Sequence, residues 1–440
     1  MIAIVLMVLG ALGLGYGFLT GSNNSVEDAK AAIAHHEAEH NAHHPEGKET
    51  HQETAHDEHT THDEHASHDT GFDKVGHAQT QLNNRPWSAL YVPLFYFFMI
   101  ALAVFVFYAM QIGASAGWSI VLFRVMEAMS RAIVPLGILL VIFMGIAAYT
   151  HLNHIFPWIH YEGVDKILEG KAWWLNANGW FIRSVIYIAG FIFFRYIIIK
   201  NNHEQDSAPK GNFKAHEKAF KYTIMFIGFF LITETLLSID WVMSLDPHWF
   251  SSLFAWYIFA SSIVTGITLI AVVVIYLKSI GYLKNVNNSH IHDLAKYMFG
   301  FSIFWTYLWF AQYMLIWYSN MPEETTYFMQ RMMQYKTIFY AMPILNLLFP
   351  FLILMDSDYK RISWIVVFAG LFILVGHYID FFVMIMPSTT GAYWHFGIPE
   401  IGGILFFLGL FVFCGFHNLQ KRALVPKNNP YLQESEHYHY

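Results

Sequence analysis

Acidic side chains lie within stretches of this chain that are otherwise apolar. Glu234 and Asp240 belong to one such stretch and stand six residues apart. In a helix this spacing is about 9 Å along the axis, a gap that water molecules can bridge. Charged groups are costly inside hydrocarbon, so each is a candidate functional residue. A carboxyl at the depth of Glu234 is desolvated, which favours its neutral form, and it could then exchange a proton near neutral pH.

Further titratable side chains lie on a later apolar stretch and at the ends of others. His377 and Asp380 are three residues apart, so in a helix they share a face and can hydrogen-bond. A set of acids and histidines is expected near one membrane boundary, as proton uptake or release requires: Asp240, Asp246, His248, His377, Asp380, His395 and Glu400. The candidates for a proton path are Glu234, Asp240, Asp246, His248, His377, Asp380 and Glu400, and no residue is assigned a catalytic role.

These polar residues also have a structural interpretation, in which they cap helices and pair with other subunits. For Asp246 and His248, expected in a loop, neither interpretation is favoured. Glu234 lies deeper, which favours function. Gln312 and Asn346 either extend a polar path or form hydrogen bonds between helices.

Histidine spacing gives little support for a bound metal or haem. His151 and His154 have helical spacing but no accompanying carboxylate ligand, so no metal site is predicted. A haem b site needs two histidines facing each other at similar depth. His377 has no such counterpart, so none is expected.

Composition shows the setting in which these residues act. Of 440 residues, 55% are hydrophobic and 13% are charged, against roughly a quarter charged in a soluble domain. This excludes a soluble enzyme, a disordered scaffold and a nucleic-acid binder. The single cysteine, Cys414, cannot form an internal disulfide, a four-cysteine iron–sulfur site or a C-x-x-C-H haem attachment. Any such redox centre would belong to another chain or not exist.

Ten apolar segments of about 19 to 25 residues are long enough to cross a bilayer. They are 1–19, 88–111, 132–150, 180–199, 220–239, 253–277, 297–318, 337–355, 362–384 and 398–417. The sequence therefore predicts an all-α polytopic membrane protein. With a cytoplasmic N-terminus, sixteen of the 25 Lys and Arg residues fall on the cytoplasmic side. The positive-inside rule then places both termini and the 200–218 loop in the cytoplasm.

One polar segment, 20–86, is expected to form a loop on the outer face. Twelve histidines lie between His35 and His77, among Glu, Asp, Thr and Ala. Neutral imidazoles bind Zn, Ni or Cu, so a metal-scavenging tract is one interpretation. The absence of regular ligand spacing favours the other, a solvated tether.

Two apolar segments end alike, which indicates an internal duplication. Ser238–Met243 reads SIDWVM and Tyr378–Met384 reads YIDFFVM. The two segments are four apart in order, so the repeats share an orientation. The predicted organisation is a first helix (1–19), the polar loop (20–86), four-helix bundles at 88–239 and 253–384, and a last helix with a cytoplasmic tail (398–440).

Three motifs carry a resemblance to a known family. They are SIDWVMSLDPHWFS at 238–251, NSHIHDL at 288–294 followed by FGFSIFW at 299–305, and PEIG at 399–402. With the ten segments and the His-rich first loop, they resemble the NrfD/PsrC-like membrane subunits of alternative complex III, and most closely the ActF branch. The resemblance covers nearly the whole chain outside 20–86.

The resemblance implies a fold, a location and partners. The fold would be two four-helix bundles with two peripheral helices, in the bacterial inner (cytoplasmic) membrane. The partners would be an NrfD-like sister subunit, periplasmic subunits holding iron–sulfur clusters and c-type haems, lipids and, as an open case, a terminal oxidase. This chain would bind no cofactor of its own. Menaquinone or ubiquinone is left open, because the sister subunit is the usual candidate for quinol oxidation.

We therefore expect a membrane subunit of a respiratory quinol:cytochrome c (or periplasmic acceptor) oxidoreductase that anchors the redox subunits. A proton path through the segments 220–239 and 362–384 is a further hypothesis. The rival is a free-standing proton-coupled secondary transporter, whose repeats also place ionisable residues in helices. No segment shows the Gly/Pro-broken centre typical of a midplane substrate site, which weighs against the transporter.

Overall fold

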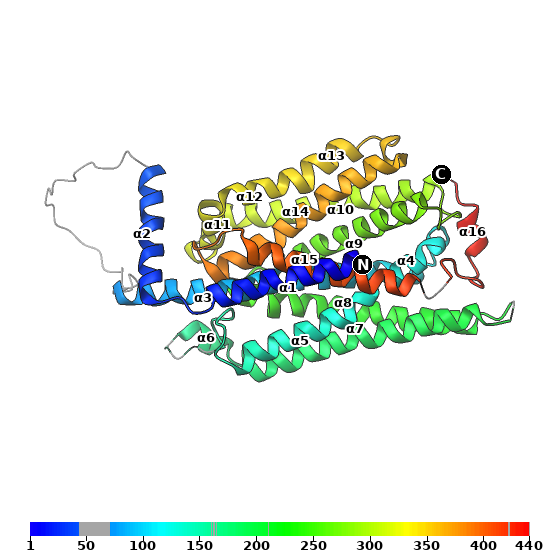
Figure 1. Cartoon of the computed structure of the whole chain (residues 1–440). Coiled ribbons are helices and arrows are strands. Elements are labelled where there is room, and N and C mark those ends of the chain that lie inside the picture. Colours follow the sequence, from blue (N-terminus) through cyan, green and yellow to red (C-terminus); the bar gives the residue numbers. More distant parts are fainter. Residues whose placement is uncertain are drawn as a thin grey trace.

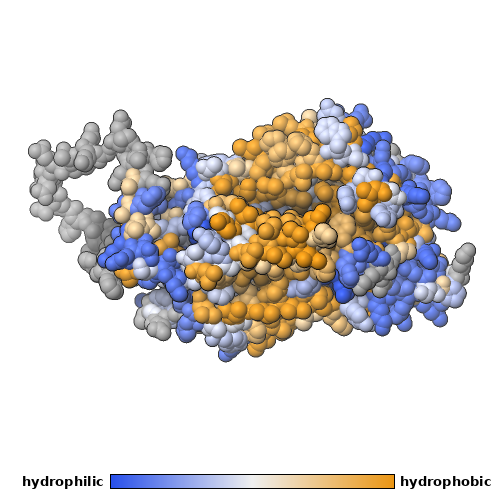
Figure 2. All heavy atoms as spheres, viewed as in Figure 1, coloured by the Kyte–Doolittle hydropathy of each residue, from blue (hydrophilic) through white to orange (hydrophobic). Residues whose placement is uncertain are grey.

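The computed structural model describes residues 1–43, 71–159, 161, 163, 165–209, 211–420 and 423–439. Within these ranges the regular structure is helical and no strand occurs. Ten spans in the described residues are long and apolar enough to cross a membrane. They run side by side in alternating directions, and apolar side chains form a band around the middle of the bundle (Figures 1 and 2). The predicted all-α polytopic membrane fold is confirmed.

The spans agree with the predicted segments in number and order. They are α1 (Ile2–Gly21), α3 (Gly71–Gly113), α4 (Phe123–Met129) continuing into α5 (Ile133–Tyr149), α7 (Ala177–Asp206), α8 (Lys214–Trp241), α9 (Phe254–Ser279), α10 (Asn288–Ser319), α12 (Lys336–Pro343) continuing into α13 (Phe349–Leu354), α14 (Ser363–Thr390) and α15 (Ile398–Leu419). Outside them lie α2 (Val26–His43), α6 (Lys166–Lys171), α11 (Pro322–Gln334) and α16 (Leu432–Glu436). We call the two ends of the bundle the α2 end and the α16 end (Figure 1).

Two helices extend into the segment expected to be a polar loop. α2 lies across the end of the bundle, and α3 begins at Gly71, well before the predicted 88. α2 forms because its sequence is rich in Ala and Glu, which are strong helix formers. Its first turn is fixed by Ser25 and Asp28, since the Ser25 amide and hydroxyl both donate to Asp28 Oδ2, at 2.8 and 2.7 Å. The histidines between 44 and 70 lie outside the described residues.

α3 is the central helix of the molecule. Nearly every side chain from Tyr91 to Ala109 is buried, and the helix contacts α5 and α8 on one side and α9, α14 and α15 on the other. A helix that is apolar all round must be enclosed by others. α3 therefore belongs to a first group of helices with α5, α7 and α8. It connects this group to a second one made of α9, α10, α12–α13 and α14.

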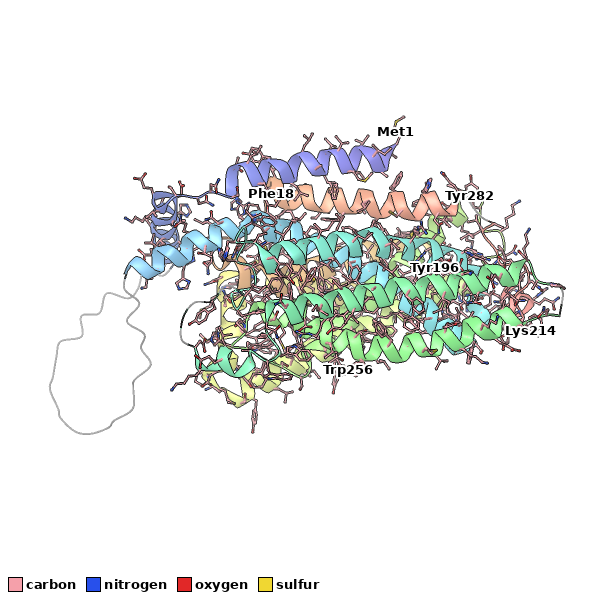
Figure 3. The ribbon with its side chains drawn as sticks, turned by 90° about the horizontal axis from the view of Figure 1, so that it is seen from below. Met1, Phe18, Tyr196, Lys214, Trp256 and Tyr282 are labelled. Atoms are coloured by element: carbon pink, nitrogen blue, oxygen red, sulfur yellow. The ribbon has the colours of Figure 1, made fainter. Side chains whose placement is uncertain are left out.

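α1 packs along α15 at the edge of the bundle (Figure 3). Glycines make this close contact feasible, because a Cβ at Gly10 would stand 2.3 Å from the backbone nitrogen of Phe406. Across the same contact, a Cβ at Gly402 would stand 2.8 Å from the carbonyl carbon of Gly13. Small residues allow helix backbones to approach closely in membranes.

The span at 336–354 is interrupted near its centre, against expectation. α12 and α13 are separated by a π-helical turn, Ile344–Leu348. Pro350 has no N–H to give to the carbonyl four residues earlier, that of Asn346, so the regular ladder cannot continue there. The expectation that no span has a proline-broken centre holds in part: Lys336–Leu354 remains one span, but the residues between Pro343 and Pro350 form a π-helical turn.

Candidate functional site

The most enclosed polar cluster surrounds Asp380 on α14, and we call it the Asp380 cluster. Asp380 and His377 are fully buried. From α9, the Tyr257 hydroxyl donates to Asp380 Oδ1, and the Ser261 hydroxyl donates to Oδ2 at 2.8 Å. From α10, Trp305 Nε1 donates to Oδ2 at 2.8 Å. The expected contact between His377 and Asp380 is present, with Nδ1 3.5 Å from Oδ2, and Ser261 Oγ lies 2.9 Å from the same nitrogen.

Several polar atoms next to this cluster have no hydrogen-bond partner among the described residues. They include His377 Nε2, Gln312 Nε2 and both amide atoms of Asn346. Asn346 stands against α14, since a Cβ at Gly376 would lie 2.0 Å from Asn346 Oδ1. Buried polar groups are normally satisfied, so such a group indicates an ordered water or a functional role. The α12–α13 span therefore places Asn346 against Gly376, the residue that precedes His377.

Asp240, the matching residue of the first repeat, is held differently. Arg183 on α7 pairs with it, donating from Nε to Oδ2 at 2.9 Å and from Nη2 to Oδ1 at 2.8 Å. Trp174 Nε1 and the Tyr187 hydroxyl also donate, at 2.8 and 3.1 Å. A bidentate arginine strongly stabilises the charged carboxylate. Asp240 is therefore held in an ion pair that fixes α8 to α7.

The two repeat ends stand at one level on opposite sides of α3. Phe95 packs against Trp241 with ring centroids 6.2 Å apart, and against Phe381 with centroids 5.5 Å apart. α14, however, continues to Thr390 rather than ending at the predicted 384. Asp380 therefore lies ten residues before the end of its helix.

Glu234 is buried on α8 with a single hydrogen bond, from the Ser238 hydroxyl at 3.1 Å. It lines a cavity of about 10 Å³ together with side chains of α3 and α9, among them Ser262. On α9, Ser262 is the neighbour of Ser261, which donates to Asp380. The two consecutive serines therefore link the surroundings of Glu234 with the Asp380 cluster across one helix.

The loop residues of the motif lie at the α2 end. His248 is exposed and its Nε2 stands 2.6 Å from Asp165 Oδ2, and this hydrogen bond holds the pKa of Asp165 below its usual range. The Asp246 carboxylate interacts electrostatically with Lys171 and Arg331. These contacts join the 243–250 turn to the α6 loop and to α11.

Glu400 and His395 form a separate pair of contacts with α3. Arg85 Nε stands 3.1 Å from Glu400 Oε1, and the Gly397 amide donates to Oε2 at 2.8 Å, which closes the first turn of α15. Arg85 Nη2 reaches the carbonyl oxygen of His395 at 3.4 Å. Burial lowers the pKa of His395, and the Arg85 charge lowers it further. Glu400 therefore fixes the start of α15 and lies apart from the Asp380 cluster.

Two buried charged groups were missed from the sequence. Near the α16 end, Glu127 accepts from Arg124 Nη1 at 2.6 Å and from the Tyr108 hydroxyl at 2.8 Å, with His203 Nε2 2.8 Å away. Arg124 also pairs with Asp206. The sequence placed Arg124 before the predicted span at 132, so its burial was not foreseen. The available signal was the apolar stretch before 132, because a span that begins at Gly117 includes both Arg124 and Glu127.

The second is Arg331 on α11, which is 2% exposed. Pro387 has no N–H for the carbonyl of Val383, four residues earlier, and Arg331 Nε donates to that oxygen at 3.1 Å. Its Nη2 donates to the Met384 carbonyl, also at 3.1 Å. Burial lowers the pKa of Arg331. A proline that leaves a carbonyl free was the available signal, but the sequence alone did not say which side chain would reach it.

Among the described residues, no group of three or more His, Cys, Asp or Glu side chains is arranged to hold a metal ion. No protein-family model matches this chain. A search of curated proteins finds no similar sequence. The Asp380 cluster, Glu234 and the serines between them are therefore the basis for assigning a function.

Proposed function

We propose that this chain is a proton-conducting membrane subunit of a respiratory quinol:cytochrome c (or periplasmic acceptor) oxidoreductase, of the NrfD/PsrC-like kind and closest to ActF. The supporting features are the 238–251, 288–305 and 399–402 motifs and the ten spans. In this proposal the α16 end and both termini face the cytoplasm of a bacterial inner membrane. The sister subunit and the periplasmic haem and iron–sulfur subunits supply the electron carriers.

The observation that carries the proton path is the chemistry around Asp380. Its hydrogen-bond donors among the described residues are two hydroxyls and an indole, none of them cationic. Hydroxyl groups both donate and accept, so a Ser or Tyr can relay a proton by turning its O–H. Ser261 lies between Asp380 and His377, two titratable groups, and is built for this relay.

Glu234 is the second proton-exchanging group of the proposed path. It is buried without a cation among its hydrogen-bond partners, and its cavity is bounded by Ser262. About 10 to 15 Å³ is the lower limit for a water molecule, so a small outward movement of the lining admits one. A proton would then pass from Glu234 through water in this cavity and along the polar side of α9, near Ser262 and Ser261, to the Asp380 cluster.

One observation favours the rival function. The interrupted α12–α13 span places Asn346 with both amide atoms unpartnered, and broken helices mark substrate sites in secondary transporters. Purification separates the two functions. A complex subunit brings haem-containing partners through mild detergent extraction, whereas a transporter is recovered alone or as a homo-oligomer.

The test of the proton path is Glu234→Gln in the assembled complex. This change keeps shape and hydrogen bonding but removes titration, so we expect full haem content with proton movement lost or turnover made pH-dependent between roughly pH 6 and 8. Glu204→Gln is the matched control, because Glu204 is exposed on α7. Wild-type behaviour of Glu234→Gln in both respects would remove Glu234 from the path. If that variant does not assemble, Asp380→Asn addresses the same question.

A further inference from the structure

A long apolar groove runs along one face of the molecule. It has a volume of about 530 Å³, within the roughly 300–1,000 Å³ of ligand pockets. Side chains of α14 and α15 form its walls, and side chains of α3 and α9 form its floor. The surface is apolar and hollowed between these walls (Figure 2).

The groove follows one face of α15. Ile404, Leu408, Phe411, Val412 and Phe416 line it, at the spacing that places residues on one side of a helix. From Ile404 to Phe416 is about 18 Å of helix, slightly more than half of the roughly 30 Å hydrocarbon thickness. The length therefore matches an extended hydrocarbon chain within one leaflet.

One basic side chain, Arg131, lies near the end of the groove closest to α16. Met129 and Phe416 close it there, and exposed Arg131 lies two residues beyond Met129. Arg131 has no hydrogen bond or ion pair among the described residues, and its charge is close enough to act on Arg195 and Cys414. Two nearby arginines repel each other, so an anion beside Arg131 would be bound favourably.

We propose that this groove holds one acyl chain of an anionic phospholipid, with its phosphate at Arg131. Within hydrocarbon the chain is held by van der Waals contact with the walls, because an unfilled groove would leave their side chains without partner atoms. The phosphate compensates an arginine that would be costly at the edge of the hydrocarbon. The lipid thereby fixes α15, and α1 behind it, against the second helix group.

The test uses the full chain, extracted in mild detergent and analysed by native mass spectrometry. Val412→Trp places a bulky ring in the groove. Ile186→Trp on α7 is the matched control, since the Ile186 side chain is 55% exposed and does not line the groove. We expect wild type and the control to retain one more phospholipid than Val412→Trp. Equal retention by all three, or a quinone in place of the phospholipid, would overturn the proposal.

The headgroup is tested with vesicles of phosphatidylglycerol or phosphatidylcholine. Arg131→Gln should reduce the preference for phosphatidylglycerol by about fivefold, the weight of one basic side chain beside anionic lipid. An unchanged preference would remove Arg131 from the site.

A third measurement needs no substitution. Cys414 is the single thiol and lies within range of the Arg131 charge, so a bound headgroup should slow its alkylation by a water-soluble maleimide. We expect delipidation to speed the reaction at least threefold, and phosphatidylglycerol but not phosphatidylcholine to reverse it. An alkylation rate that does not change with lipid would contradict the proposal, even if Val412→Trp failed to fold.

Discussion

At the scale of single residues, two aspartates in matching sequence contexts have different chemistry because their neighbours differ. Asp240 is paired with Arg183 from α7. Asp380 is surrounded by donors from α9 and α10 that carry no positive charge. A fixed ion pair resists protonation, whereas a carboxylate among hydroxyls can exchange a proton with them. The two matching motifs therefore contain one structural acid and one candidate for proton transfer.

The ion pair predicts a large loss of stability on substitution of Arg183. Arg183→Gln leaves the buried Asp240 carboxylate without its cation, which should lower the free energy of unfolding by about 3 kcal/mol. Lys200→Gln is the control, because the Lys200–Glu204 pair is 3.9 Å long and more than half exposed. Thermal unfolding in detergent measures both. A second change, Asp240→Asn, should recover part of the loss, and no recovery would show that Arg183 acts mainly through packing.

The Asp165–His248 contact predicts a pH dependence at the α2 end. Its hydrogen bond lowers the pKa of Asp165 below an ordinary value of about 3.9. A depressed folded-state pKa contributes stability above the unfolded-state value, and this is lost as the pH falls through the folded-state pKa. The protection of the amides in the 245–250 turn against hydrogen exchange, relative to their intrinsic rates at each pH, should therefore fall below about pH 4. Asp165→Asn should show the faster exchange already at neutral pH, and the same acid transition in that variant would point to another group.

At the scale of elements, close helix contacts and helix breaks decide where side chains meet. Glycines let α1 approach α15, and Pro350 interrupts α12–α13 so that Asn346 stands beside α14. Arg331 occupies a carbonyl that Pro387 leaves free. Each of these is a local backbone property with a consequence for a different helix.

The α1–α15 contact predicts a clear difference between two glycines of one helix. Gly10→Leu should cost about 1–3 kcal/mol, because its Cβ would meet the Phe406 backbone at 2.3 Å. Gly15→Leu, where nothing lies within 4 Å, should be neutral or slightly stabilising. The two melting temperatures in detergent measure the difference. Equal values would mean that α1 contributes little to the stability of the bundle.

At the scale of the whole molecule, α3 joins two helix groups, and ten spans return the chain to the end at which it began. The N- and C-terminal segments both run toward the α16 end (Figure 1). In our proposal, which rests on the Lys and Arg bias, this end faces the cytoplasm.

This arrangement predicts the outcome of a topology experiment. Reporter fusions after residue 50 and after residue 210 should lie on opposite sides of the membrane, because three spans separate these positions. Activity of a periplasmic reporter at 50 and its absence at 210 is the expected result. The reverse pattern would retain ten spans but overturn the cytoplasmic assignment of the termini.

The sequence by itself determined the class of fold, because ten long apolar segments leave a chain few alternatives to membrane-spanning helices. It also identified Glu234, His377 and Asp380 as polar residues of membrane-spanning segments, although it placed His377 and Asp380 near a membrane boundary, since their cost in hydrocarbon can be read from neighbouring residues alone. It could not tell Asp240 from Asp380, because Arg183 and Ser261 reach them across helix contacts that no local pattern specifies. The tertiary structure decided which acid is neutralised by a cation and which is left among hydroxyls.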